Sequence, residues 1–150
     1  MSKANSFLKK LHAYVNDSER KSTHPKMAKK KVFISFDFDN DSILRDFLVG
    51  QSKNSDSPFE IEDWSVKIPW NQSEWKEKCL TKIKKTDVVI VIVGQKTYSA
   101  SGVKEEIKMA KDAGKKVYGI KGYSDKNCPR PDGMDGYYNW TWQNLKNILS

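Results

Sequence analysis

Hydrophobic residues follow two alternating patterns along the chain. The stretch from Val88 to Val93 consists of six consecutive Val or Ile residues. β-branched side chains favour strands, and an unbroken run of them is typical of a strand that is covered on both faces of a parallel sheet. A polar loop follows, and then Val103, Ile107 and Ala110 recur at helical spacing. The pattern therefore predicts strands that alternate with helices.

The same two patterns predict five strands, at residues 32–36, 59–61, 88–93, 116–120 and 138–140. Helices are predicted from residue 42 to near Gly50, from 73 to 85, from 103 to near Gly114, and from 142 to 149. We expect Asp41 or Ser42 to cap the first helix and Thr141 the last. Strands that alternate with helices imply right-handed crossovers, so the predicted fold is α/β, a doubly wound parallel sheet of about five strands with helices on both faces.

Residues 1–30 are predicted to form a basic extension, and residues 31–150 the domain. Within the extension, helical spacing of apolar residues predicts a short amphipathic helix at 3–16, followed by a polar linker. Residues 1–31 contain nine Lys or Arg and two acidic residues, a balance of +7, whereas the whole chain has a net charge of +8. The domain is therefore nearly neutral, and nucleic acid is not an expected partner.

The remaining composition narrows the class of protein. Cys79 and Cys128 lie far apart and neither belongs to a C-x-x-C pair, so free thiols and a cytoplasmic location are expected. Cys79 lies on an apolar helix face, where we expect it to be buried and inert. Both histidines, His12 and His24, lie in the extension, which argues against His-dependent catalysis and a metal site. No apolar run is long enough to span a bilayer, so no membrane association is expected.

The loops after the strands exclude several nucleotide-binding families. Asp37-Phe38-Asp39-Asn40 follows the first strand and contains no glycine, which excludes both the Rossmann dinucleotide motif and a P-loop. A flavodoxin phosphate loop is absent from the same position. The middle strand ends in Val93-Gly94-Gln95, where a response-regulator receiver has its phosphoacceptor Asp. Metal-dependent phosphotransfer is therefore not supported.

In their order and spacing, six segments resemble the TIR-like family, in particular its short bacterial and archaeal branch, which is similar to the TIR-like proteins of the Thoeris anti-phage system. These segments are Lys31–Asp37, Glu62–Ser65, Thr86–Thr97, Val103–Ile107, Gly114–Lys116 and Trp140. The resemblance covers residues 31–149 and implies a flavodoxin-like fold. It also implies an activity, because catalytic TIR proteins cleave the nicotinamide–ribose bond of NAD⁺, and some cyclise the ADP-ribose product.

The resemblance further implies which residues form the site. The essential Glu of catalytic TIR proteins lies near the start of the helix after the central strand, and Glu106 matches it, while Glu105 is expected to be a solvated neighbour. Breaking the C1′–N bond builds positive charge on the ribose, which a carboxylate stabilises. We expect the substrate to be held by aromatic faces, by the end of the first strand and by N–H groups at a helix start. The expected substrate-binding residues are Phe36, Asp37, Trp64, Trp70, Ser99 and Val103.

The expected partners are NAD⁺ or a related nucleotide as substrate, a separate effector protein reached through a nucleotide signal, and further copies of the chain. No bound cofactor is expected. The sequence departs from the family in one place: many catalytic TIR domains carry Trp four residues before the Glu, where this chain has Gly102. A non-catalytic interaction module is therefore the alternative interpretation, and a nucleotide sensor without turnover is a third. Trp75, Trp140 and Trp142 are expected to serve in packing.

Overall fold

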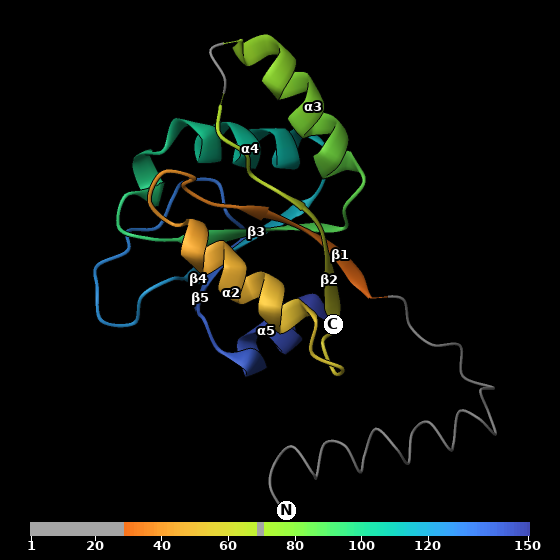
Figure 1. Ribbon diagram of the computed structural model, residues 1–150, viewed down its shortest axis with the longest axis vertical. Helices are drawn as coiled ribbons and strands as arrows, with labels where there is room; N and C mark the ends of the chain where they lie inside the picture. Colours follow the sequence, from red (N-terminus) through yellow and green to blue (C-terminus); the bar gives the residue numbers. More distant parts are fainter. Residues whose placement is uncertain (1–28, 69–70) are drawn as a thin grey trace, which may run out of the picture.

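A computed structural model describes residues 29–68 and 71–150 of the chain (Figure 1). The predicted helix at 3–16 and its linker lie outside the described residues, as does Trp70. The elements are β1 (Lys30–Ser35), α2 (Ser42–Ser52), β2 (Phe59–Trp64), α3 (Gln72–Lys84), β3 (Val88–Val93), a 3-10 turn η1 (Thr97–Ser99), α4 (Ser101–Asp112), β4 (Lys116–Lys121), β5 (Gly136–Asn139) and α5 (Trp142–Leu149).

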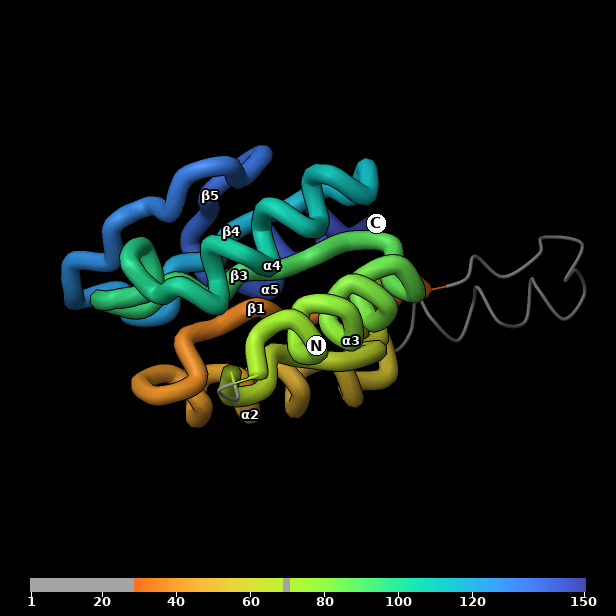
Figure 2. The backbone as a smooth tube through the Cα atoms, turned by 90° about the horizontal axis from the view of Figure 1, so that it is seen from above, coloured from red at the N-terminus to blue at the C-terminus, as the bar shows by residue number. Residues whose placement is uncertain are grey.

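The five strands form one parallel sheet in the order β2-β1-β3-β4-β5. This order confirms the predicted α/β class and is that of flavodoxin-like folds. In such folds the chain adds strands first toward one edge of the sheet and then, from β3 onward, toward the other edge. Helices α3 and α4 lie on one face and α2 and α5 on the other (Figure 1), and Figure 2 shows α3 and α4 in front of the sheet. The loops after β1, β3 and β4 gather at one edge, on the left of Figure 1.

The buried residues of β3 show why its sequence has no polar position. Val89, Val91 and Val93 pack against α3 and α4, whereas Val88, Ile90 and Ile92 pack against α2 and α5. Successive side chains of a strand point to opposite faces, so a central strand covered on both faces must be apolar throughout. The two clusters also receive the apolar stripes of the helices, such as Leu44 and Leu48 of α2.

Element ends differ from the prediction in small ways. Helix α2 continues past Gly50 to Ser52, β2 extends to Trp64, and the last strand begins at Gly136 rather than 138. Thr141 caps α5 as predicted, since its hydroxyl accepts a hydrogen bond from Asn144 N at 3.0 Å. The expected side-chain cap of α2 is absent.

Asp41 occupies the N-cap position of α2 without capping it, because its carboxylate has another partner. Thr97 Oγ1 donates to Asp41 Oδ2 at 3.1 Å and accepts from Gly94 N at 2.7 Å. Both side chains are buried, and burial, the largest cause, raises the pKa of Asp41. This network ties the loop after β1 to the loop after β3, and these two loops form walls of the site described below.

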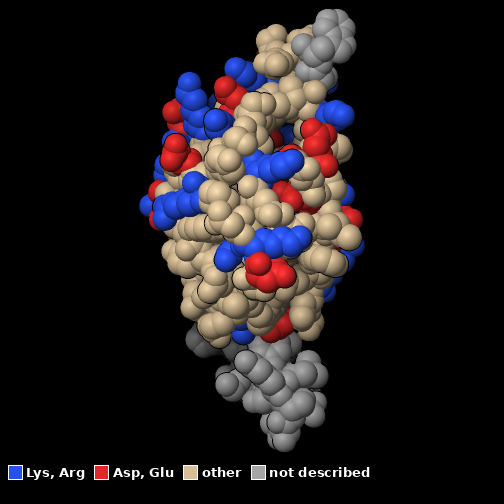
Figure 3. Space-filling view, turned by 90° about the vertical axis from the view of Figure 1, so that its left-hand side faces the viewer, with Lys and Arg blue, Asp and Glu red and all other residues tan. Residues whose placement is uncertain are grey.

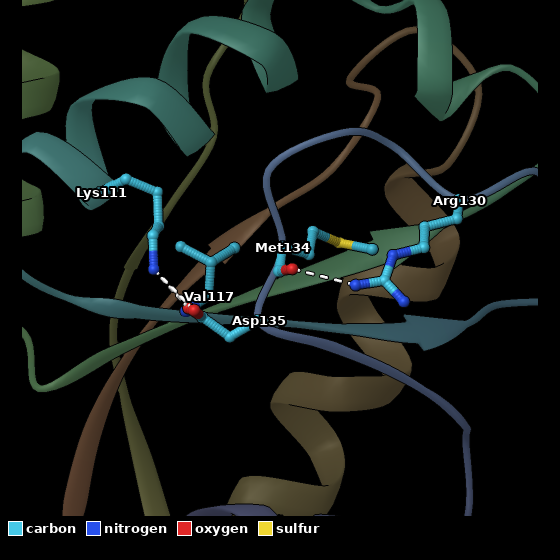
Figure 4. Close-up of polar contacts among 5 residues, drawn as sticks. All are labelled: Lys111, Val117, Arg130, Met134 and Asp135. Carbon is cyan, nitrogen blue, oxygen red and sulfur yellow. Dashed lines mark hydrogen bonds and ion pairs between the residues drawn. The ribbon is translucent and has the colours of Figure 1, made fainter.

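The connection between β4 and β5 is anchored to α4 by Asp135 (Figure 4). Lys111 Nζ lies 2.6 Å from Asp135 Oδ1, and Val117 N donates to Oδ2 at 2.8 Å. The lysine hydrogen bond is the main cause that lowers the pKa of Asp135. Further along, Arg130 Nη2 donates to Met134 O at 2.9 Å. A connection of this length without regular structure needs such fixed points, because most of its backbone groups lie outside the sheet.

We predict that Gly94→Ala destabilises the fold by about 1–3 kcal/mol, since an added Cβ would overlap the buried Asp41 carboxylate. The matched control is Gly50→Ala on α2, where nothing lies within 4 Å of an added Cβ. That substitution should raise stability by about 0.5–1 kcal/mol, because glycine is unfavourable inside a helix. Urea unfolding of both variants checks the pair, and equal stability for them would contradict the Asp41 network.

Candidate active site

Glu106 is a carboxylate on the buried face of α4. Its neighbours on that face are Val103, Ile107 and Ala110, and the Glu106 side chain itself is 1% exposed. A fully buried acid is rare unless its oxygens are hydrogen-bonded, because an unpaired charge loses its hydration without compensation. The apolar periodicity of α4 therefore places an acid at a position where packing alone would favour a hydrophobic residue.

Three side chains donate to this carboxylate. Ser35 Oγ and Ser65 Oγ both lie 2.6 Å from Oε1, and Cys79 Sγ lies 3.6 Å from Oε2. Short O–H···O⁻ distances are typical of charge-assisted hydrogen bonds. Ser35, Ser65 and Cys79 are themselves buried. The donors come from the end of β1, the residue after β2, and the middle of α3, so four elements converge on one carboxyl group.

An irregularity between β1 and β2 brings the two serines together. The register shifts between Val32 and Phe33, so that Phe33 pairs with Asp63 rather than Glu62. Ser35 and Ser65 each lie two residues after this pair and therefore point to the same sheet face as Phe33, which packs against α3 and α4. Ser65 N also donates to Ile34 O at 2.9 Å, which continues the ladder by one residue.

Burial raises the pKa of Glu106 from its ordinary 4.5 to about 7, and the hydrogen bonds from Ser35, Ser65 and Cys79 partly oppose this effect. The positive charge of Lys82 also lowers the pKa of Glu106, and it is the smallest of these causes. Burial, together with the Glu106 charge, raises the pKa of the Cys79 thiol far above its ordinary range, in agreement with an inert thiol. A carboxyl group poised near neutrality beside a cavity is a recurrent feature of functional sites.

Two cavities border Glu106. One has a volume of about 330 Å³ and is lined by Phe33 of β1, by residues of the end of β2 and the segment after it, and by residues of α3 that include Trp75, Cys79 and Lys82. The other has a volume of about 380 Å³ and lies among the loops after β1, β2 and β3 and the start of α4. Both volumes fall within the range of small-ligand sites, and the second lies at the reversal point of the sheet, where such folds bind ligands.

The structure brings most of the predicted site residues to these cavities. Phe36, Asp37, Ser99 and Val103 line the second cavity together with Glu106, and Trp64 lines the first. Glu105 is half-buried and forms an ion pair with Lys76 at 3.6 Å, as expected of a solvated neighbour.

The rings of Trp64 and Phe36 have other partners. Both pack with the α2–α5 cluster, on the sheet face opposite Glu106. The Arg45 guanidinium lies 5.1 Å from the Trp64 ring centroid and 5.5 Å from that of Phe36. Asp37 accepts hydrogen bonds from Asp39 N and Asn40 Nδ2, so its carboxylate shapes the turn after β1. None of these three side chains touches Glu106 through a hydrogen bond in the described structure.

The sequence analysis gave no site role to four residues near Glu106, namely Ser35, Ser65, Cys79 and Trp75. Ser35 and Ser65 lie at the carboxyl ends of neighbouring strands, and that placement was the available indication. Cys79 and Trp75 were assigned to packing, because both lie on the apolar stripe of α3 with Ile83. They do pack there, but Cys79 contacts the carboxylate and Trp75 lines both cavities.

Gly102, where the sequence departs from the catalytic pattern, lines the second cavity beneath Ile68. A Cβ at position 102 would lie 3.0 Å from Ile68 Cδ1. A side chain at this position would therefore need Ile68 to shift by a few tenths of an ångström.

The surface at the carboxyl edge of the sheet carries Lys, Arg, Asp and Glu intermixed, without a field of one sign (Figure 3). In residues 29–68 and 71–150, no cluster of three or more His, Cys, Asp or Glu side chains has the arrangement of a metal site. Over the same residues, no helix has the length and hydropathy needed to cross a membrane.

The fold and the position of the buried carboxylate define a flavodoxin-like α/β domain of the TIR-like class. The family described as "Thoeris protein ThsB, TIR-like domain" matches residues 33–127, more than half of the chain, and the chain belongs to this family. The match includes Ser35, Ser65 and Glu106. No curated protein matches the chain in sequence.

Among solved structures, a CMP N-glycosidase, BcmB, from Clostridium botulinum shows a TM-score of 0.49 at 16% identity, covering 79% of this chain and 98% of that one. A 3-dehydroquinate dehydratase-like protein from Bifidobacterium longum shows 0.46 at 11% identity, with 81% and 95% covered. A prokaryotic SEFIR domain shows 0.43 at 14% identity, with 79% and 86% covered. Likenesses this weak carry no argument about function.

We predict that Glu106→Gln alters how stability depends on pH. The folded pKa, about 7, exceeds the ordinary 4.5, so the folded chain holds an extra proton between these values. The resulting stabilisation is complete below about pH 4.5 and is lost as pH rises through 7, by up to about 3 kcal/mol. Glu106→Gln should remove this loss and be more stable than the wild type at pH 8.

Urea unfolding at pH 5 and pH 8 measures the effect, and Glu105→Gln is the matched control. Glu105 is half-exposed, so its substitution should leave the pH dependence of the wild type in place. If Glu106→Gln and the wild type lose the same stability between the two pH values, Glu106 does not titrate near neutrality.

Proposed function

We propose that the chain cleaves the nicotinamide–ribose bond of NAD⁺, with Glu106 as the catalytic carboxylate. The observation that carries the proposal is a buried carboxylate, held by two serines and bordering two cavities, in a chain of the TIR-like family. As the C1′–N bond breaks, its electron pair leaves with nicotinamide and positive charge develops on the ribose, until water adds to C1′ and loses a proton to give ADP-ribose. A negative charge fixed beside C1′ stabilises that state, and a low-dielectric site strengthens the attraction.

Ser35 and Ser65 have a positioning role in this proposal. Both donate to Oε1, so they hold the carboxyl group and leave Oε2, which has only the weak Cys79 contact, as the oxygen with fewer hydrogen bonds. Because the hydrogen bonds are already formed, the charge needs little reorganisation during the reaction.

The second cavity offers groups that suit the pyrophosphate of NAD⁺. Lys67 and Lys96 line it together with the first residues of α4. The N-cap residue Ala100 makes no side-chain cap, and the first backbone N–H groups of a helix have no intrahelical acceptor. Positive charge and free N–H groups at a helix start favour phosphate.

The product would be an ADP-ribose derivative that acts on a separate effector protein. Self-association of the chain belongs to the same proposal.

Purified protein incubated with NAD⁺ should release nicotinamide, and Glu106→Gln should lower the rate by about a hundredfold or more. Since the charged carboxylate is the active form, kcat/KM should rise with pH through 7 and be about tenfold lower at pH 6 than on the plateau. Glu105→Gln should retain the wild-type rate. Nicotinamide release that survives Glu106→Gln would overturn the assignment, and its absence in protein and infected-cell lysate would overturn the activity.

The non-catalytic alternative has one observation in its favour. Ile43 and Phe47 are one turn apart on α2 and are each 59% exposed, which gives this helix an unshielded apolar face. If the chain is an interaction module, Phe47→Ser should abolish self-association in analytical ultracentrifugation, Glu106→Gln should preserve it, and no NAD⁺ turnover should occur. Self-association unaffected by Phe47→Ser would remove this support.

A further inference from the structure

Trp75 has an unsatisfied hydrogen-bond donor and lines the two cavities that border Glu106. Of the buried side-chain nitrogen and oxygen atoms in the described part of the chain, Trp75 Nε1 lacks a hydrogen-bond partner. The residue is only 5% exposed. Buried Trp N–H groups normally find an acceptor, and leaving one unpaired costs about 1–3 kcal/mol. A bound ligand that accepts a hydrogen bond from this N–H would remove the cost.

The position of Trp75 is consistent with such a ligand. Trp75 lies in the first turn of α3, one turn before Cys79, which contacts Glu106 Oε2. Together with Glu106, Val66 and Lys67, it lines both cavities. Its ring belongs to the cluster between the sheet and the α3–α4 layer, the same side as Glu106.

The other aromatic residues near the site do not share this position, and Phe33, which faces the same side of the sheet, lines only the first cavity. Trp64 and Phe36 pack on the opposite sheet face beside Arg45, and position 102 has no side chain and is covered by Ile68. Among the described residues, Trp75 is therefore the tryptophan that borders both cavities on the Glu106 side.

We propose that Trp75 is a substrate-binding residue whose Nε1–H donates a hydrogen bond to an uncharged oxygen of the nucleotide bound next to Glu106. The inference rests on the proposed function and deepens it by naming a specificity determinant. Two parts of NAD⁺ on either side of the bond to be broken carry uncharged oxygens, namely the nicotinamide carboxamide and the ribose. The indole ring also supplies the aromatic surface that Gly102 does not.

The experiment uses the whole chain with nicotinamide and ADP-ribose as separate probes, since neither is consumed by bond cleavage. With ¹⁵N-labelled indoles, the five tryptophans give few resonances, and Trp75→Phe assigns the relevant one. The Trp75 N–H resonance should move downfield on binding. A shift with nicotinamide alone identifies the carboxamide as acceptor, and a shift with ADP-ribose alone identifies the ribose.

Binding by calorimetry supplies the second readout. Trp75→Phe should weaken the probe that shifts the resonance by about three- to tenfold, the loss of one neutral hydrogen bond. Trp142→Phe, on α5 and in the other cluster, is the matched control and should bind like the wild type. Because Phe also leaves a void, a 3-benzothienylalanine at position 75, which keeps the ring shape without N–H, should reproduce the loss.

The outcomes separate the two proposals. If the wild type binds a probe and cleaves NAD⁺ while the Trp75 resonance stays in place and the benzothienyl variant binds normally, the Trp75 inference is wrong and the proposed function stands. If the wild type binds neither probe and releases no nicotinamide, the proposed function fails, and the Trp75 inference fails with it.

Discussion

The burial of one carboxyl group is the constraint on which the site depends. Glu106 lies among apolar residues on the inner face of α4, and the hydrogen bonds from Ser35, Ser65 and Cys79 offset part of its desolvation. These donors come from β1, β2 and α3, so the carboxylate fixes the relative positions of four elements. A shift of any one of them would remove one of the three donors to a buried carboxylate, which is more costly than the loss of a single contact between methyl groups.

The burial of Glu106 lowers the stability of the fold when the carboxyl group carries the charge that the proposed reaction needs. A pKa of about 7 means that the charged form, which is the useful one for a developing cation, is the form the fold accommodates less well near neutral pH. The Trp75 N–H has the same character, because it is buried without a hydrogen-bond partner, and under our proposal a ligand supplies that partner. Local features that reduce stability and gather around one cavity are typical of sites shaped by function. Elsewhere polar groups are satisfied within the fold, as in the Asp41–Thr97–Gly94 network.

Sequence patterns predicted the sheet well because periodicity reports burial directly. The six β-branched residues of β3 favoured a strand covered on both faces, and the α4 stripe identified the helix that carries Glu106. Patterns were less informative where one residue serves two purposes. Trp75 and Cys79 fit the apolar stripe of α3, so nothing in the spacing distinguished packing from contact with the carboxylate. Trp64 and Phe36 were assigned to the pocket by sequence position, yet their rings pack beside Arg45 across the sheet.

The sequence by itself determined the order of strands and helices, the α/β class, the family resemblance and the choice of Glu106 over Glu105. The strand and helix order and the fold class follow from local periodicity, whereas the choice of Glu106 follows from the family resemblance, which six segments between residues 31 and 149 carry. Only the tertiary structure decided that Ser35, Ser65 and Cys79 share one carboxyl group and that Trp75 borders both cavities. Ser35 and Glu106 are 71 residues apart, and the register shift between β1 and β2 decides which way Ser65 points. Strand pairing over such distances, and the sheet face that each side chain then meets, is set by packing of the whole domain rather than by any local pattern.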